Sequence, residues 1–380
     1  MDNYVFSCGK KLRKGYTTSS CAAAGAKAAV TMLLSQKKLE TVFLLTPNQT
    51  PLTLKIENQE IGEAFASCSI RKFSGDDPDI TNGIEIFSLA EKNENKGLVI
   101  TGGEGIGKVT KKGLLVPVGE YAINPAPMEM IKSAVLEACS DFEVPANIKI
   151  TIFAPEGKEI AKKTYNPKLG IEGGISILGT SGIVFPMSSE AILKTIELEI
   201  RQKKAEGKTS LLFCPGNYGE NFIKNKTKLS PKTAVKCSNF VGDSLDLAYE
   251  MGFKKALLVG HIGKLVKLAG GIMNTHSRNG DCRMEIIASS AAFFTDDIKL
   301  LRNILNQKTT LSAVKLLKNA GILEQTFEKI TSNAYEKLNQ RFFGDMEIEL
   351  IMFTEEDGIL GKSKGADSLT KKILFEENEK

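Results

Sequence analysis

The stretch KALLVGHIGK, residues 255–264, carries the clearest structural signal in this chain of 380 residues. A short apolar run ends in glycine, which is typical of a buried strand, and a helical pattern follows from Lys264. Around it, Leu211–Cys214 and Val235–Phe240 are expected strands and Asp243–Met251 is an expected helix. Strands that alternate with helices at this spacing predict a Rossmann-like, doubly wound parallel sheet. The second half is therefore expected to be an α/β domain.

The first half has a different pattern, in which short apolar runs alternate with glycine turns and predict a mixed α+β domain. An alanine-rich helix is expected at Ser19–Leu34, with Thr17 and Thr18 as candidate N-caps. The expected strands are Thr41–Leu45, Leu52–Ile56, Phe65–Phe73, Leu98–Thr101, Leu114–Val118 and Ile148–Phe153. Further helices are expected at Pro127–Cys139 and Ser189–Glu206. The charged end of the latter places the boundary near residue 206, with domains at residues 1–206 and 207–380.

Downstream, the pattern predicts mostly helix over Asp281–Phe294 and Leu311–Gln340 and a late strand over Glu347–Phe353. The last fifteen or so residues are charged, and we expect them to be loosely ordered.

Composition excludes several classes of protein. Hydrophobic residues make up 42% and charged residues 25%, as in soluble globular proteins. No apolar run reaches the roughly 18 residues of a membrane span, and the N-terminus lacks the apolar core of a secretory signal, so a cytoplasmic protein is expected. The absence of tryptophan and the 7% of aromatic residues disfavour stacking on single-stranded nucleic acid, whereas the net charge of +5 fits a polyanionic small molecule. Seven cysteines without a CxxC pair predict free thiols and no metal site.

Residues 101–110, TGGEGIGKVT, contain a glycine motif with two interpretations. Gly102, Gly107 and Lys108 match G-x-x-x-x-G-K, but Val109 stands where a P-loop needs Ser or Thr. The segment KKGLLVPVG follows in place of the required helix, so hydrolysis of ATP or GTP is rejected. Either this is a glycine hairpin, or its backbone forms a wall for a bulky planar ligand. The candidate wall residues are Gly103, Glu104 and Gly105.

Residues 166–187, NPKLGIEGGISILGTSGIVFPM, contain five glycines. They form either a series of turns or a cradle in which backbone N–H groups, together with Thr180 and Ser181, bind carboxylates.

The chain has only two histidines, and both lie within sixteen residues. His261 follows an expected parallel strand at its carboxyl end, where open α/β sheets bind ligands. His276 lies beside Arg278 and close to Arg283. A catalytic role is the hypothesis for both histidines, and an ordinary surface or core position is the alternative.

The segment PGNYG, residues 215–219, follows the first expected strand of the second half, where Rossmann-like domains hold an adenosyl or dinucleotide ligand. It lacks the G-x-G-x-x-G pattern, so nicotinamide binding is disfavoured. Asp243 could bind a ribose hydroxyl or could be an N-cap. The candidate cofactor-binding residues are Gly216, Asn217, Tyr218, Gly219, Asp243, Gly260 and Gly263.

Six motifs in order resemble one family, the cobalt-precorrin-5B C-methyltransferases of anaerobic cobalamin biosynthesis (the CbiD family). They cover residues 12 to about 290. The motifs are LRKGYTT (12–18) with the alanine-rich helix, GGEGIG (102–107), GLLVPVGEYAINPAPMEMI (113–131), NPKLGIEGGISILGTSGIV (166–184), GNYG (216–219) and GHIGKLVKLAGGIMNTHSR (260–278).

The resemblance implies an enzyme that transfers the methyl group of S-adenosylmethionine to ring carbon 1 of a ring-contracted tetrapyrrole, giving cobalt-precorrin-6A. The substrate carries the cobalt, and the ring supplies the nucleophilic carbon. The protein then mainly aligns the reactants and excludes water, which can lower the barrier by roughly 7–11 kcal/mol.

The substrate's acetate and propionate arms would meet Arg13, Thr17, Thr18 and Arg278. His261 or His276 would manage a proton on the macrocycle or lie against the cobalt. A homo-oligomer is compatible with the sequence.

Two other functions remain open. A tetrapyrrole carrier without turnover would use the same glycine walls and arginines but would need no adenosyl pocket. A nicotinamide-dependent reductase would share the α/β half but is disfavoured by the missing fingerprint.

Overall fold

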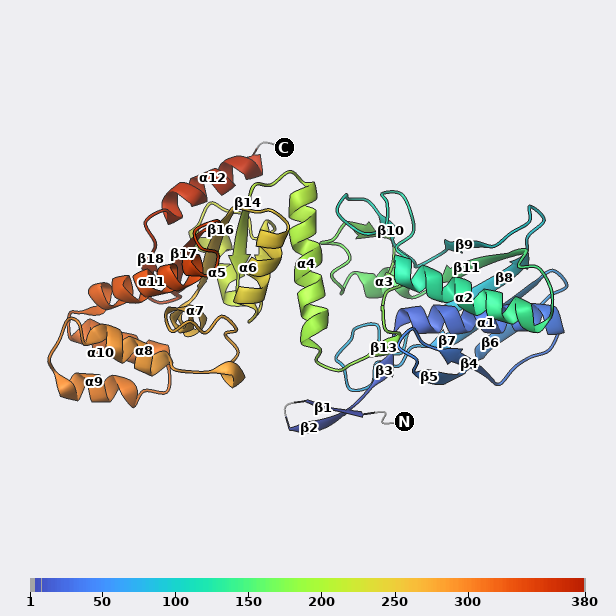
Figure 1. The fold of residues 1–380 in the computed structure, drawn as a ribbon, viewed down its shortest axis with the longest axis horizontal. Helices are drawn as coiled ribbons and strands as arrows, with labels where there is room; N and C mark the ends of the chain where they lie inside the picture. Colours follow the sequence, from blue (N-terminus) through green and yellow to red (C-terminus); the bar gives the residue numbers. More distant parts are fainter. Residues whose placement is uncertain (1–3, 8, 379–380) are drawn as a thin grey trace. The chain divides into compact units, whose positions relative to one another are not determined.

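The computed structural model describes residues 4–7 and 9–378 (Figure 1). Contacts divide the chain into two compact units, Met1–Ser189 and Glu190–Lys380. This division falls at the start of helix α4 (Ser189–Ala205), whereas the sequence analysis placed the boundary after that helix, near residue 206. The buried Ile196 and Ile200 of α4 belong to a core of the second unit, which accounts for the difference.

The first unit is built on a five-stranded sheet in the order β6-β7-β8-β11-β9. Its strands are β6 (Glu57–Ile61), β7 (Phe65–Arg71), β8 (Glu85–Lys92), β11 (Ile148–Phe153) and β9 (Val99–Gly102). Only β9 and β11 run parallel; the other pairs are antiparallel. The central strand β8 was not predicted, although its side chains alternate between buried and half-buried along most of its length, as a strand with one core face requires.

Helix α1 (Thr18–Ser35) packs on β7 and β8, and α2 (Pro125–Asp141) lies along α1 (Figure 1). The alanine-rich part of α1 is buried on every side. A Cβ on Gly25 would lie 2.7 Å from the Ser88 hydroxyl of β8, so only small residues permit this close approach. The expected helix is confirmed, and of its two candidate caps Thr17 is the N-cap, because its hydroxyl accepts a hydrogen bond from the Ser20 N–H, whereas Thr18 is the first helical residue.

Short paired strands and one short helix, α3 (Gly157–Ala161), complete the first unit. The pairs are β1 (Tyr4–Ser7) with β2 (Lys10–Arg13), β3 (Gly15–Tyr16) with β13 (Ile183–Val184), β4 (Thr41–Leu45) with β5 (Pro51–Lys55), and β10 (Lys108–Val109) with β12 (Ile171–Glu172).

The strand expected at Leu114–Val118 is wrong, because that segment forms turns. Gly113 and Gly119, which flank it, adopt φ of 99° and 94°, and Pro117 has no N–H to pair.

The second unit contains a five-stranded sheet in the order β15-β14-β16-β17-β18. Its strands are β14 (Ser210–Cys214), β15 (Ala234–Lys236), β16 (Lys255–His261), β17 (Glu347–Thr354) and β18 (Gly358–Lys362). The first four in this order are parallel, whereas β18 is antiparallel to β17. The expectation of an exclusively parallel sheet is therefore wrong at this edge, because the three-residue turn after β17 returns the chain directly alongside it.

Helices cover both faces of this sheet (Figure 1). Helices α5 (Asn217–Lys226) and α12 (Ala366–Asn378) bury Ile223 and Leu369 against one face. The opposite face meets α4, α6 (Val241–Glu250), α7 (Ile262–Ala269) and α11 (Leu323–Gln340). The residues of β14 alternate between these two cores. This arrangement is the α/β organisation that the sequence predicts.

The loose C-terminus expected from the charged tail is wrong within the described residues. That segment forms α12, whose Ala366, Leu369 and Ile373 are buried against the sheet. The strand expected at Val235–Phe240 ends at Lys236, since Ser238 adopts a positive φ of 51°.

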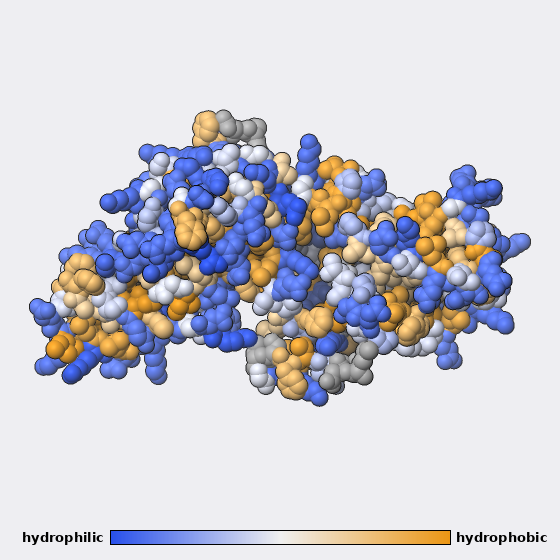
Figure 2. All heavy atoms as spheres, viewed as in Figure 1, coloured by the Kyte–Doolittle hydropathy of each residue, from blue (hydrophilic) through white to orange (hydrophobic). Residues whose placement is uncertain are grey.

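Between α7 and α11 the chain forms the 3₁₀ turn η1 (Ser277–Asn279) and three helices, α8 (Arg283–Ala291), α9 (Ile298–Leu305) and α10 (Thr310–Asn319). Figure 2 shows a mainly hydrophilic surface, with apolar side chains gathered over these helices. Phe293 and Ile298 are among the exposed residues there.

Six cysteines in the described part of the chain are free thiols, as expected, and only Cys282 among them is exposed. Across residues 4–7 and 9–378, no helix combines the length and the apolar character that crossing a bilayer requires.

Candidate functional site

In the first unit, the start of α1 is joined to the glycine-rich turn of residues 176–184. The Thr18 hydroxyl donates to the Leu178 carbonyl over 3.0 Å and accepts from the Leu178 N–H. The Ser20 hydroxyl donates to the Gly182 carbonyl, and the Thr17 N–H donates to that same carbonyl. Two motifs that lie 160 residues apart in the sequence are thus brought together, and the turn is held by the Thr17 N–H and by the buried hydroxyls of Thr18 and Ser20.

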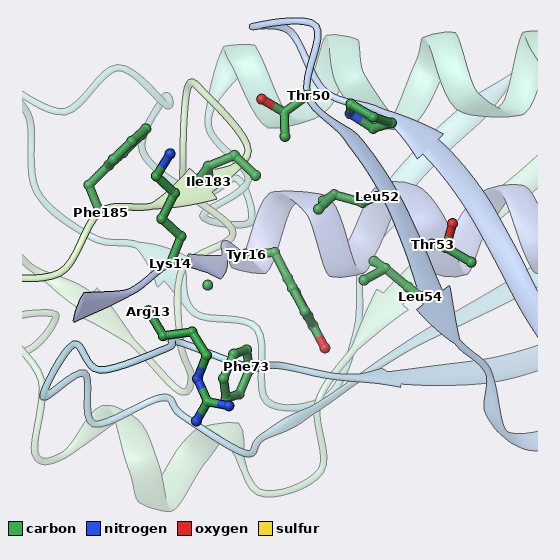
Figure 3. Close-up of a pocket in the computed structure, with 12 residues that line it drawn as sticks. Arg13, Lys14, Tyr16, Thr50, Leu52, Thr53, Leu54, Phe73, Ile183 and Phe185 are labelled. Atoms are coloured by element: carbon green, nitrogen blue, oxygen red, sulfur yellow. The ribbon is translucent and has the colours of Figure 1, made fainter. Parts of the chain in front are cut away.

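A cavity of about 450 Å³ lies beside this junction (Figure 3). Its volume is in the range of small-molecule sites. One wall comes from β5, with Leu52 and Leu54, and the opposite side comes from β3 and β13. The residues that line it are Arg13, Lys14, Gly15, Tyr16, Thr50, Pro51, Leu52, Thr53, Leu54, Phe73, Ile183 and Phe185. We refer to this cavity as the α1 pocket.

Two cations of the α1 pocket lie over aromatic rings. The Arg13 guanidinium is 4.8 Å from the centroid of Phe73, and Lys14 Nζ is 5.2 Å from that of Phe185 (Figure 3). The Tyr16 hydroxyl donates to the Arg71 carbonyl, and burial raises the pKa of Tyr16 to about 12. The pocket therefore joins an apolar wall to two positive charges, which suits a flat ligand with carboxylate arms.

The other candidate substrate-binding residues of the first unit lie in turns that pack closely against the backbone of neighbouring segments. The Ser181 hydroxyl donates to the Ile183 carbonyl, in the same turn as Thr180. Gly105 accepts from the Ile175 N–H, and a Cβ on it would lie 1.7 Å from the Ala154 carbonyl oxygen.

The 103–105 segment packs against protein, and its residues are not among those lining the α1 pocket. Gly103 and Glu104 belong to this segment, and Glu104 is exposed. The strand β10 begins at Lys108, where a P-loop would begin a helix, so the rejection of a nucleotide-hydrolysing loop is confirmed.

In the second unit, the loops after β14 and β16 leave the sheet toward opposite faces. The chain passes from β14 into α5, which belongs to one core, and from β16 into α7, which belongs to the other. In an open α/β sheet, such a divergence at the carboxyl ends of neighbouring strands creates a ligand-binding crevice. We refer to this place as the β14–β16 edge.

At the β14–β16 edge, glycines allow the loops and helix α5 to approach the strands closely. Gly216 adopts a φ of 100° between β14 and α5. A Cβ on Gly219 would lie 2.8 Å from Cys214 Cβ and 2.9 Å from the Val259 carbonyl oxygen, so α5 can approach the sheet only with glycine there. A Cβ on Gly260 would meet Pro215 at 2.8 Å.

These positions follow the spacing of a dinucleotide fingerprint with a cysteine in place of its first glycine. Cys214, Gly216 and Gly219 stand at the three glycine positions of G-x-G-x-x-G. Gly216 provides the place where backbone can approach a ligand, and Gly219 provides the close helix–strand contact. The strict pattern is absent, as the sequence shows, but this partial match was not predicted.

His261 is half-buried at the β14–β16 edge, where it caps α7. Its Nδ1 accepts a hydrogen bond from the Gly263 N–H over 3.0 Å. Its ring lies 5.6 Å from that of Tyr218 and edge-on to Phe353. Burial lowers the pKa of His261, while Glu355 opposes that shift, so the neutral form is favoured. With Nδ1 accepting, the neutral ring carries its proton on Nε2 and presents a donor.

His276 has a similar local role outside that edge. It caps η1, and its Nδ1 accepts from the Arg278 N–H over 3.1 Å. Arg278 is exposed, and its guanidinium makes no hydrogen bond or ion pair within residues 4–7 and 9–378. The buried Lys267 holds this loop by donating to the carbonyls of Thr275 and Gly280.

Asp243 lies inside α6 and not at its N-cap. It is exposed in the first turn of α6, seven residues after β15 ends, and Phe240 occupies the N-cap position. Its alternative role as an N-cap is therefore wrong, and its role toward a ribose remains a prediction. The segment that follows β15 directly contains Ser238 and Asn239 instead.

Three residues at these places were missed as candidates: Lys14 and Phe185 in the α1 pocket and Lys264 at the β14–β16 edge. Lys14 follows Arg13 and Lys264 follows Gly263 in the sequence, and both were usable signals, whereas Phe185 becomes a neighbour of the α1 pocket only through tertiary contacts. In the described part of the chain, no group of three or more His, Cys, Asp or Glu residues could hold a metal ion.

Comparison with known proteins identifies one family. The CbiD family model matches residues 6–186, and the model of the CbiD C-terminal domain matches residues 274–364.

Three relatives are each named cobalt-precorrin-5B C(1)-methyltransferase. The protein from Clostridioides difficile is 41% identical over 98% of this chain and all of its own length. The protein from Clostridium perfringens is 45% identical over 96% of this chain and 99% of its own. The protein from Methanocaldococcus jannaschii is 44% identical over 94% of this chain and 98% of its own.

A crystal structure of a cobalamin biosynthesis protein (cbiD) from Archaeoglobus fulgidus is also similar. It is 27% identical, with a TM-score of 0.40, over 73% of this chain and 86% of that one.

Proposed function

This chain belongs to the CbiD family, and we propose that it uses S-adenosylmethionine to methylate ring carbon 1 of cobalt-precorrin-5B, giving cobalt-precorrin-6A. The observation that carries the proposal is the near-complete alignment with relatives of that name, which spans 94% to 98% of this chain in the three described above. The geometry of each unit supports one half of the reaction.

The β14–β16 edge is the proposed donor site, within a Rossmann-like domain that has an antiparallel edge strand. The strand order and the helices on both faces support this, as do the two fingerprint glycines, Gly216 and Gly219. S-adenosylmethionine would supply an electrophilic methyl group there. Asn217 and Tyr218 begin α5, and the N–H groups of this first turn, which have no acceptor within the helix, would be available to the ligand. Gly260 and Gly263 flank His261 on the other side.

The α1 pocket is the proposed tetrapyrrole site. Leu52, Leu54 and Ile183 would contact the macrocycle, and Arg13 and Lys14 would pair with its carboxylate arms. The Thr17 N–H and the buried Thr18 hydroxyl would act indirectly, by holding the 176–184 turn and with it β13. The protein's contribution is then to bind, orient and keep water out, with no nucleophile of its own.

Incubation of the full-length chain with methyl-labelled S-adenosylmethionine and cobalt-precorrin-5B tests the proposal. Mass analysis is expected to find one labelled methyl group on the tetrapyrrole and S-adenosylhomocysteine in equal amount. A tetrapyrrole carrier would bind the macrocycle and leave its mass unchanged, which would contradict the proposal.

A further inference from the structure

Lys264 is an unusual cation for its place in the fold. It is the third residue of α7, so it lies in the first turn, where the helix dipole already presents a positive end. The first turn of α7 contains no acidic residue. A lysine there is unfavourable unless an anion comes close, because the ammonium and the helix end repel each other.

The surroundings of the Lys264 ammonium leave it without a counter-ion. Nζ donates to the Ser238 carbonyl over 3.1 Å, and no carboxylate lies within 4.0 Å of it in the described residues. An ammonium has three donors, so two remain for a ligand. Burial lowers the pKa of Lys264, and the neighbouring thiols of Cys214 and Cys237 oppose that shift while Lys267 adds to it. A partly desolvated, unpaired ammonium attracts an anion more strongly than an exposed one does.

The ammonium of Lys264 also lies inside the proposed donor site. It joins the loops after β14 and β15, since Nζ contacts Ser238 on one side and would be 3.5 Å from a Cβ on Gly216 on the other. Glycine at 216 therefore leaves the approach to Nζ open. The rings of Tyr218 and His261 and the two glycines of the fingerprint belong to the same edge.

We propose that Lys264 binds the carboxylate of the methionine part of the methyl donor and so makes the site specific for an amino-acid sulfonium. This inference rests on the proposed function, because it takes the β14–β16 edge as the donor site. The acetate arms of the tetrapyrrole offer the same carboxylate chemistry, and the experiment separates the two sources by measuring donor binding with no tetrapyrrole present.

Calorimetric titration of the full-length chain with S-adenosylmethionine and with its decarboxylated analogue tests the inference. A charge-assisted hydrogen bond of about 1.5–3 kcal/mol gives the unmodified chain a preference for the carboxylated ligand of about tenfold or more. In Lys264→Met that preference is expected to fall close to one, with binding of the decarboxylated ligand retained. Lys264→Arg keeps the charge and is expected to keep the preference, which also shows that the site is still folded.

Lys299→Met is the matched control, because Lys299 is an exposed lysine in the first turn of another helix, α9. It is expected to leave both affinities unchanged. If Lys264→Met discriminates between the two ligands as well as the unmodified chain does, the inference is overturned while the proposed function stands. A change in Lys264→Met confined to the KM for the tetrapyrrole overturns it too. If the unmodified chain binds neither ligand, the proposed donor site itself fails.

Discussion

At the scale of single residues, both histidines use Nδ1 to cap a helical turn, so their local roles can be separated from any part in catalysis. For His261 the capped N–H is that of Gly263. Asparagine is a favoured N-cap and alanine is a poor one. We expect His261→Asn to keep the free energy of unfolding near that of the unmodified chain and His261→Ala to lower it by about 1 kcal/mol. Urea denaturation measures both values.

Equal losses in the two variants would contradict the capping role. Methyl-transfer rates of the same two proteins then address chemistry: if the imidazole moves a proton, both variants lose activity, and if it only caps the helix, His261→Asn retains it.

The pH dependence of stability follows from the same histidine. Its pKa is lowered in the folded state from an ordinary value of 6.5, so the unfolded chain binds the proton more tightly. The stabilisation that the neutral His261 gives to the folded state is fully present above pH 6.5. It is lost as the pH falls from 6.5 through the lower pKa of the folded state, because protonation of Nδ1 removes the acceptor for the Gly263 N–H. Unfolding measured from pH 7.5 to 5 is expected to show a smaller loss of stability in His261→Asn. Parallel curves for both proteins would show that His261 does not titrate in this way.

The cations of the α1 pocket provide a prediction about the tetrapyrrole. Arg13 is exposed and Lys14 is half-buried, so each ion pair with a carboxylate arm is expected to contribute up to about 1 kcal/mol. Arg13→Met and Lys14→Met are each expected to raise the KM for cobalt-precorrin-5B about fivefold with little change in kcat. Lys10→Met is the control, because Lys10 begins the same strand β2 as Arg13 but does not line the pocket, and it should leave both constants unchanged. An unchanged KM in the pocket variants would place the macrocycle elsewhere.

At the scale of elements, the packing of α5 on β14 depends on one glycine. A Cβ at Gly219 would press on Cys214 and on the Val259 carbonyl, and neither can move without shifting the sheet. Gly219→Ala is therefore expected to lower the free energy of unfolding by about 1–3 kcal/mol, although alanine is the better helix former. Chemical denaturation measures the change.

Asn221→Ala serves as the control on the exposed face of α5, where the same helix-favouring substitution meets no neighbour. If Gly219→Ala were as stable as this control, the tight helix–strand contact would be absent.

At the scale of the whole molecule, ligand binding distinguishes the proposed enzyme from its alternatives. A ligand that binds only the folded chain stabilises it by about 2.7 kcal/mol at a concentration of one hundred times its Kd. S-adenosylmethionine is expected to raise the melting temperature of the full-length chain, and NADPH at the same concentration is expected to leave it unchanged. Stabilisation by NADPH in place of S-adenosylmethionine would favour the reductase.

The sequence by itself determined the features that depend on local pattern. The alanine-rich helix with its Thr17 cap, the alternation of strands and helices in the second half and the rejection of a P-loop are all confirmed. Six motifs in order were enough for the family, because they are spread over most of the chain. In each case the information lies in neighbouring residues or in their order.

Tertiary structure alone decided what depends on partners distant in the sequence. The α1 pocket exists because the start of α1 bonds to a turn 160 residues away, and Lys264 gains its position from Ser238 and Gly216. The charged C-terminal segment forms α12 because the sheet offers its three buried side chains an apolar face, which no local pattern contains. The α1 pocket, the position of Lys264 and the formation of α12 have the same physical reason. Burial and hydrogen bonding depend on which groups are close in space, and the local sequence pattern does not contain that information.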